Sequence, residues 1–130
     1  MANILLLEPD AYLGNVYKKY LSDHGYTVTH CKEASQAISS LDTSDIDLVI
    51  LEVQIALHNG IEFLYELRSY PDWQNIPVII NSVIPKQILE QNKLLQKQLS
   101  IAEILYKPTT KLHMLLSSVK RNVPAIRTVV

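Results

Sequence analysis

The sequence is poor in the residues that build disulfides, zinc sites and phosphate loops. It has one cysteine, Cys31, and three isolated glycines, Gly14, Gly25 and Gly60. A single cysteine cannot form an internal disulfide, which fits a reducing compartment, and its apolar surroundings predict a buried, unreactive thiol. The scattered glycines exclude a glycine-rich phosphate loop and a dinucleotide fingerprint. The four histidines show no spacing typical of zinc ligands.

Excess charge and long apolar runs are scarce as well. Twelve Lys and Arg against 13 Asp and Glu leave a net charge of −1, so no basic surface for nucleic acid or anionic lipid is predicted. The apolar run near the start, Ile4 to Leu7, is far too short to span a membrane. No basic segment precedes it, as one would in a signal peptide. We therefore expect a cytoplasmic protein that contacts neither membrane nor nucleic acid directly.

What the chain does have is a regular alternation of two hydrophobic periods. Hydrophobic residues make up 48% of the sequence, enough for the core of one domain. Short apolar or alternating segments predict strands, and apolar residues at helical spacing predict helices between them. The strands are expected at residues 3–7, 26–31, 47–51, 77–81 and 101–106, and the helices at 11–25, 33–41, 61–70, 85–100 and 109–121.

This alternation determines the expected fold class. Strands that alternate with helices pair in parallel through right-handed crossovers, which places helices on both faces of the sheet. We predict a doubly wound α/β domain of flavodoxin-like type, with five parallel strands in the order 2-1-3-4-5. The domain is expected to cover residues 1–121. Residues 122–130 lack a hydrophobic period and are expected to form a C-terminal tail.

Polar residues end four of the five predicted strands. Glu8, with Asp10 close behind, follows the first strand, Glu52 ends the third, Ser82 follows the fourth, and Lys107 follows the fifth. Ligands of open parallel sheets bind outside the carboxyl ends of the strands. The sequence therefore predicts that these acids, the hydroxyl and the lysine converge at one edge of the sheet.

These segments resemble the receiver domain of bacterial response regulators, the CheY-like phosphoacceptor domain. The matching pieces, between Ile4 and about Arg121, are "ILLLEPD", "DLVILE", "NGIEFLYELR", "IPVIINS" and "YKPTTKL". The resemblance implies phosphoryl transfer from a histidine kinase to an aspartate that ends the third strand. It also implies Mg²⁺ held by acids after the first strand, a Ser or Thr that contacts the phosphoryl oxygens, and a lysine that pairs with their charge.

Carried onto this chain, the resemblance assigns a role to each of these residues. Glu52 takes the phosphoacceptor position, and Glu8 and Asp10 form the acidic pocket. The switch and phosphate-sensing positions fall on Ser82, Lys107 and Ile104, and Gly60 completes the loop after the acceptor.

Several of these positions depart from the family pattern. Glu52 stands where an aspartate is usual, and its extra methylene moves the carboxylate outward by about 1.5 Å. Pro9 stands where a direct Mg²⁺ ligand is usual and offers no side-chain oxygen. Ile104 replaces the usual switch aromatic, and Val83 replaces the small residue that usually follows the hydroxyl. Asp10 is expected to cap the first helix.

These departures favour a degenerate receiver, or pseudo-receiver, over a working phospho-switch. We expect a signalling module that is not an enzyme, holds no cofactor and acts by protein–protein interaction. Glu8, Asp10 and Glu52 are the only candidate ligands for Mg²⁺, with weak affinity expected, and Lys107 is expected to pair with Glu52 or Glu8. The expected partners are a histidine kinase, an output domain or another receiver, and the fourth helix, fifth strand and fifth helix form a candidate homodimer surface.

Two alternatives remain open from the sequence. The first is a phosphorylatable response-regulator receiver that uses Mg²⁺. The second is a flavodoxin-like module that binds a small molecule through Glu8, Glu52, Ser82 and Lys107.

Overall fold

A computed structural model of the chain describes residues 2–55, 59–92 and 97–123. Within these residues five strands form one parallel sheet in the order β2-β1-β3-β4-β5, which confirms the predicted topology. The strands are β1 (Asn3–Leu7), β2 (Thr27–Cys31), β3 (Leu48–Leu51), β4 (Val78–Ser82) and β5 (Ile101–Tyr106). The α-helices are α1 (Ala11–Asp23), α2 (Ala34–Thr43), α3 (Gly60–Ser69), α4 (Lys86–Glu90) and α6 (Leu112–Asn122), and two 3₁₀ turns are η1 (Pro71–Trp73) and η2 (Lys107–Thr109).

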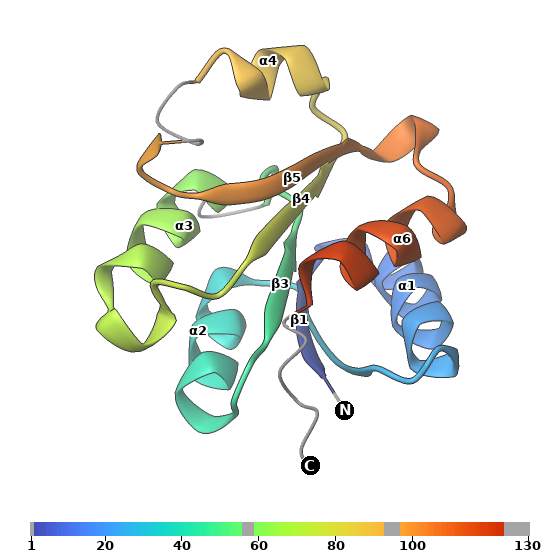
Figure 1. Cartoon of the computed structure of the whole chain (residues 1–130), viewed down its shortest axis with the longest axis horizontal. Helices are drawn as coiled ribbons and strands as arrows, with labels where there is room; N and C mark the ends of the chain where they lie inside the picture. The colour runs from blue at the N-terminus through green and yellow to red at the C-terminus, as the bar shows by residue number, and fades with distance from the viewer. Residues whose placement is uncertain (1, 56–58, 93–96, 124–130) are drawn as a thin grey trace.

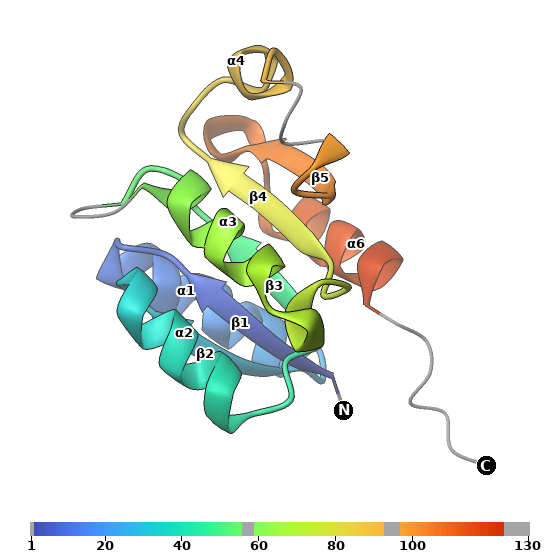
Figure 2. The same ribbon diagram turned by 90° about the vertical axis from the view of Figure 1, so that its left-hand side faces the viewer.

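Helices cover both faces of the sheet, as the alternating pattern predicts (Figure 1). Along β1, Ile4 and Leu6 pack with α1 and α6, whereas Leu5 and Leu7 pack with α2 and α3. Figure 2 looks onto the face covered by α2 and α3, with α1 and α6 behind the strands. Because successive side chains of a strand point to opposite faces, one continuous apolar strand supplies both halves of the core.

The ends of α1 show how the sequence sets the helix bounds. The side chain of Asp10 accepts a hydrogen bond from the Leu13 N–H at 2.9 Å, so Asp10 is the N-cap, as expected. After the C-cap His24, Gly25 takes a φ of 95°, a conformation that a residue without Cβ adopts readily. The helix therefore ends two residues before the predicted limit.

The long fourth helix predicted over residues 85–100 is wrong. Helix α4 covers only Lys86–Glu90, and Pro85 precedes it instead of occupying its first turn. Leu89 is the one residue of this helix that is buried, so little apolar contact holds it against the sheet. Near the other end of the predicted span, Ser100 takes a φ of 53°, outside the helical region. Residues 93–96 lie outside the described residues.

Other bounds differ from the prediction by one or a few residues. Strand β4 runs from Val78 through Ser82, and Pro77 lies just outside it, where its carbonyl accepts from the Val49 N–H. Helix α6 starts at Leu112 because the turn η2 takes up Lys107–Thr109, and it continues to Asn122, one residue past the predicted end of the domain.

Candidate functional site

Four of the predicted site residues meet at the carboxyl edge of the sheet. Glu8 directly follows β1, Glu52 directly follows β3, Ser82 ends β4, and Lys107 follows β5. Their meeting follows from the topology, because parallel strands end at the same edge. Glu8, Glu52 and Ser82 are at most 3% exposed, so this is a buried polar cluster and not a set of solvated strand ends.

Lys107 bridges the two acidic residues. Its Nζ donates to Glu8 Oε1 and to Glu52 Oε1, at 2.7 Å in each case. The sequence predicted one of these pairs, and the structure contains both. Burial lowers the pKa of Lys107, but the hydrogen bonds and charges of Glu52 and Glu8 outweigh it and raise the pKa above its ordinary value. The cluster thus holds one cation between two carboxylates and keeps a net negative charge.

The carboxylate of Glu52 accepts four hydrogen bonds. Oε1 accepts from Lys107 and from the Val83 N–H at 3.0 Å, and Oε2 accepts from the Gln54 N–H at 3.0 Å and from the Ser82 hydroxyl. Burial raises the pKa of Glu52, but the bonds from Lys107, Ser82 and Gln54 together lower it below the ordinary value. A carboxylate has about four lone-pair directions, so those of Glu52 are all used within the protein.

The carboxylate of Glu8, which follows β1, is also hydrogen-bonded within the protein. Glu8 Oε1 binds Lys107, and Oε2 accepts from the Asp10 N–H at 3.1 Å. Asp10 itself is exposed and caps α1, and Pro9 contributes no side-chain oxygen. Of the two residues in the expected acidic pocket, only Glu8 has its carboxylate in the cluster. Asp10 reaches the cluster through its backbone N–H, and its carboxylate caps α1 instead.

The remaining predicted residues lie around the cluster. Ile104 is 6% exposed and belongs to the half of the core that lies on the α2 and α3 face of the sheet. Gly60 begins α3, where its N–H donates to the Val53 carbonyl at 2.7 Å and where a Cβ would lie 2.5 Å from Val53 Cα. The side chain of Val83 is exposed, and its backbone N–H donates to Glu52.

Tyr17 and Asn81, which no sequence motif assigned to the site, lie beside it. Burial raises the pKa of Tyr17, and a hydrogen bond from Asn81 and the charge of Lys107 oppose that effect. Asn81 is 2% exposed, and within the described residues its Oδ1 has no partner. A buried Asn at the end of an otherwise apolar strand is a sequence signal that could have pointed to Asn81. Its hydrogen bond with Tyr17 depends on how α1 packs on the sheet.

His30 supports the same edge from β2. Its Nε2 lies 2.8 Å from the Glu8 carbonyl oxygen, and its ring occupies the space that a Cβ on Gly14 would enter, 2.0 Å from Cε1. A glycine in the first half of α1 therefore lets the imidazole lie between the helix and the end of β1.

The described parts of the chain contain neither a cluster of metal-binding side chains nor a membrane-spanning helix. No group of three or more His, Cys, Asp or Glu side chains there is arranged to hold a metal ion. No helix within residues 2–55, 59–92 and 97–123 is long and apolar enough to cross a bilayer.

The sheet order, the helices on both faces and the polar cluster at the carboxyl edge define a CheY-like receiver fold. Residues 4–119 match the family model of the response regulator receiver domain, and the chain belongs to that family. It is thus a receiver domain of two-component signalling, a family of signalling proteins.

Individual relatives agree with this assignment. A probable transcriptional regulator, ycf29 of Cyanophora paradoxa, is 35% identical over 80 residues, which cover 62% of this chain and 38% of that protein. The non-phosphorylated receiver domain of HemR from Leptospira biflexa is 25% identical, with a TM-score of 0.83 and complete coverage of both chains. The receiver domain of the sensor histidine kinase PA1611 of Pseudomonas aeruginosa, solved with a magnesium ion in its active-site cleft, is 24% identical, with a TM-score of 0.80 and coverage of 93% and 96%. The chain spans well under half the length of the curated relative.

Proposed function

We propose that this receiver domain is degenerate and signals through protein contacts without phosphorylation of an aspartate. The proposal is carried by the hydrogen bonding of the Glu52 carboxylate. Both of its oxygens already accept hydrogen bonds, from Lys107, Val83, Gln54 and Ser82. An acceptor needs a free oxygen in line with the incoming phosphoryl group. Misplacement by about 1 Å can cost on the order of 100-fold in rate, and Glu52 is longer than the usual aspartate by one methylene.

The surroundings of Glu8 support a receiver domain that works without Mg²⁺. Mg²⁺ requires near-octahedral oxygen ligands at about 2.0–2.1 Å. The residues after β1 do not fit this requirement, because Glu8 is bound to Lys107 and to the Asp10 backbone, Pro9 has no side-chain oxygen, and Asp10 caps α1. We therefore include no Mg²⁺ in the proposed function. The ammonium of Lys107 supplies the positive charge between the two acids.

The contacts of Glu52 also bear on the signalling state. Its carboxylate accepts hydrogen bonds from the Ser82 hydroxyl and the Lys107 ammonium. In the family pattern these two groups contact a phosphoryl group. It carries about −1 of charge, against roughly −1.5 to −2 for a phosphoryl group with three acceptor oxygens. In the proposed function this fixed charge holds the domain in one conformation.

Partners then recognise a surface that does not depend on phosphorylation. We propose a histidine kinase, an output domain or another receiver as the partner, in a cytoplasmic pathway. The surface formed by α4, β5 and α6 is the candidate homodimer interface. Ile88 on α4, 56% exposed, and Met114 on α6, 44% exposed, are the apolar side chains that it offers to a partner.

Amide NMR spectra recorded with Mg²⁺ and then with added beryllofluoride, a stable phosphoryl mimic, test the proposal. We expect neither addition to shift the amides of Glu8, Glu52, Ser82 and Lys107. The double variant Pro9→Asp with Glu52→Asp restores both missing acids and is expected to respond to the two additions together. Saturable shifts in the unmodified protein would contradict the proposal and establish the phosphorylatable alternative. An absorption band of a bound chromophore in the purified protein would support the small-molecule alternative.

A further inference from the structure

A second polar region lies at the opposite end of the sheet, where β3 and β4 begin. A cavity of about 670 Å³ is formed there by the end of α2, the loop that leads into β3, and the turn η1 with the residues on either side of it. Ligand sites typically measure about 300–1,000 Å³. This region is separate from the Glu52 cluster, and nothing proposed for that cluster depends on it.

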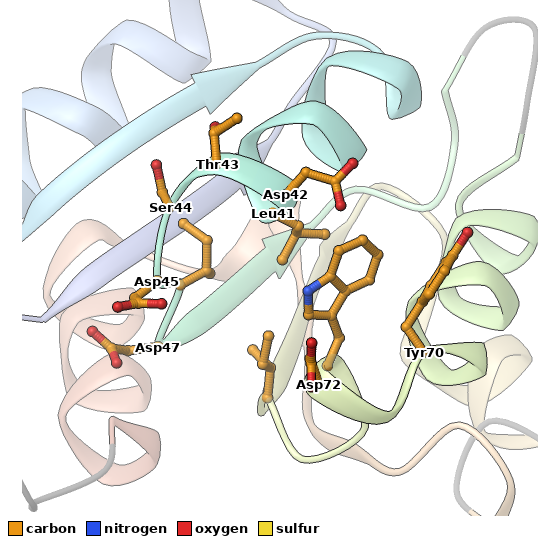
Figure 3. Close-up of a pocket in the computed structure, with 11 residues that line it drawn as sticks. Leu41, Asp42, Thr43, Ser44, Asp45, Asp47, Tyr70 and Asp72 are labelled. Atoms are coloured by element: carbon orange, nitrogen blue, oxygen red, sulfur yellow. The ribbon is translucent and has the colours of Figure 1, made fainter.

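The charge of this cavity has one sign. Four carboxylates line it, and none of the described lining residues is Lys, Arg or His. In Figure 3, Asp45 and Asp47 lie on one side of the group of lining residues and Tyr70 on the other, with Asp42 and Asp72 between them. Asp47 binds the Asn3 N–H at 2.7 Å. The carboxylates of Asp42, Asp45 and Asp72 have no hydrogen bond or ion pair to any other described residue, so they are available to a cation.

The wall between these carboxylates is aromatic and carries an unused hydrogen-bond donor. Trp73 is 9% exposed and lines the cavity, and its indole N–H meets no acceptor in the described parts of the chain. The ring of Tyr70 packs against it at a centroid distance of 4.6 Å and an angle of 52°. Aromatic faces attract organic cations, and aromatic groups next to carboxylates are a recurrent way to bind alkylammonium and guanidinium groups.

Arg68 fixes this wall in place. Its guanidinium donates to the carbonyls of Trp73, Gln74 and Ile76 at 2.8–3.1 Å, and to those of Leu99 and Ser100 on the approach to β5. The donors of Arg68 are therefore directed at backbone oxygens and not at the aspartates. The aromatic wall is preorganised, which lowers the entropic cost of binding.

We propose that this cavity binds an organic cation that carries two or more guanidinium or ammonium groups on aliphatic chains. The charged groups pair with Asp42, Asp45 and Asp72, an aliphatic segment covers Tyr70 and Trp73, and a polar atom of the ligand accepts from the indole N–H. Such a cation is either a free polyamine or a pair of arginine or lysine side chains on a basic segment of a partner protein. The chemistry is the same in both cases.

The protein contains one tryptophan, so its fluorescence reports on the cavity directly. The probes are spermine and a short peptide with two adjacent arginines, and the matched control peptide has citrulline at both positions. We expect saturable changes in Trp73 fluorescence and in the amide shifts of Asp42, Asp45 and Asp72 with at least one cationic probe, and none with the citrulline peptide. The affinity should fall steeply with added salt, because exposed charges are screened.

Two variants distinguish specific binding in the cavity from general attraction of a cation to an acidic surface. The double variant Asp45→Asn with Asp72→Asn removes two exposed carboxylates of the cavity and is expected to weaken binding about tenfold. Asp23→Asn removes an exposed carboxylate on α1 that pairs with Lys19 and is expected to leave the affinity unchanged. Binding of spermine alone assigns a free polyamine, and binding of the arginine peptide assigns a basic protein segment. Equal binding of the citrulline peptide, equal weakening by Asp23→Asn, or no saturable change with either cationic probe would overturn the proposal.

Discussion

The ammonium of Lys107 and the carboxylate of Glu52 form an ion pair at 2.7 Å in which the side chains are 9% and 3% exposed. The same ammonium also binds Glu8, so a single lysine neutralises part of the charge of two buried acids. Buried charges are costly unless they are paired and hydrogen-bonded. The stability of the domain should therefore depend strongly on these few side chains.

Replacement of Lys107 by methionine is expected to destabilise the fold. The change removes the cation but keeps most of the side-chain volume, which leaves Glu8 and Glu52 buried without a compensating positive charge. Loss of one partner of a buried pair costs about 3–5 kcal/mol, and urea unfolding at neutral pH measures it. Lys19→Met is the matched control, because Lys19 forms an exposed pair with Asp23 and should cost less than about 1 kcal/mol. A similar small cost for both variants would show that the buried cluster does not contribute to stability.

The pH dependence of stability should report on Glu52 at acid pH. Its folded-state pKa lies below the ordinary value of 4.5, since hydrogen bonds outweigh burial. Glu52 therefore contributes stability that is present above pH 4.5 and is lost as the pH falls through the folded-state pKa. The difference in unfolding free energy between the protein and Glu52→Gln is expected to shrink below pH 4.5. Glu66→Gln, at an exposed position of α3, is the control, and an equal effect of pH on both variants would contradict the assignment.

Lys107 should report on the same cluster at alkaline pH. Its folded-state pKa is raised above 10.5 by Glu52 and Glu8. The stability that it contributes is present below pH 10.5 and is lost as the pH rises through the folded-state pKa. Thermal unfolding at increasing pH is expected to show the difference between the protein and Lys107→Met shrink above pH 10.5. A constant difference across that range would show that Lys107 does not titrate as the partner of the two acids.

Gly60→Ala is expected to disturb the segment that carries Glu52. A Cβ at this position would lie 2.5 Å from the Val53 Cα, a backbone atom that cannot move without shifting the residues after β3. Overpacking of this kind costs about 1–3 kcal/mol, although alanine is the better helix former. Urea unfolding measures the loss, and amide NMR should show shifts at Glu52 and Val53. Gly25→Ala is the comparison, because a Cβ there meets nothing within 4 Å and only the φ of 95° opposes it.

Arg68→Met should loosen the η1 turn. The guanidinium holds the carbonyls of Trp73, Gln74 and Ile76 and ties them to the start of β5. Hydrogen bonds from a charged group contribute about 1.5–3 kcal/mol, so a loss of that order is expected in urea unfolding. Hydrogen exchange at residues 73–76 should accelerate. Arg68→Lys keeps the charge but not the planar fork, and full rescue by lysine would show that charge alone matters.

Local patterns in the sequence were enough to predict the parallel sheet, its strand order and the edge at which the cluster lies. Periodicity is local, and the rule that parallel strands end together places Glu8, Glu52, Ser82 and Lys107 without knowledge of any distance. The same reasoning failed for the fourth helix, because the amphipathic pattern of residues 85–100 does not show that only Leu89 within α4 finds a buried place.

The hydrogen bonds that satisfy the cluster could not be predicted from these local patterns. The N–H groups of Gln54 and Val83 point at Glu52 because of the path that the loops take after β3 and β4, and no spacing in the sequence encodes those directions. The proximity of Tyr17 to Asn81 has a similar origin, since it depends on how α1 packs on the sheet. Local hydrophobic periodicity places these groups at the edge of the sheet, and long-range packing decides which hydrogen bonds they form.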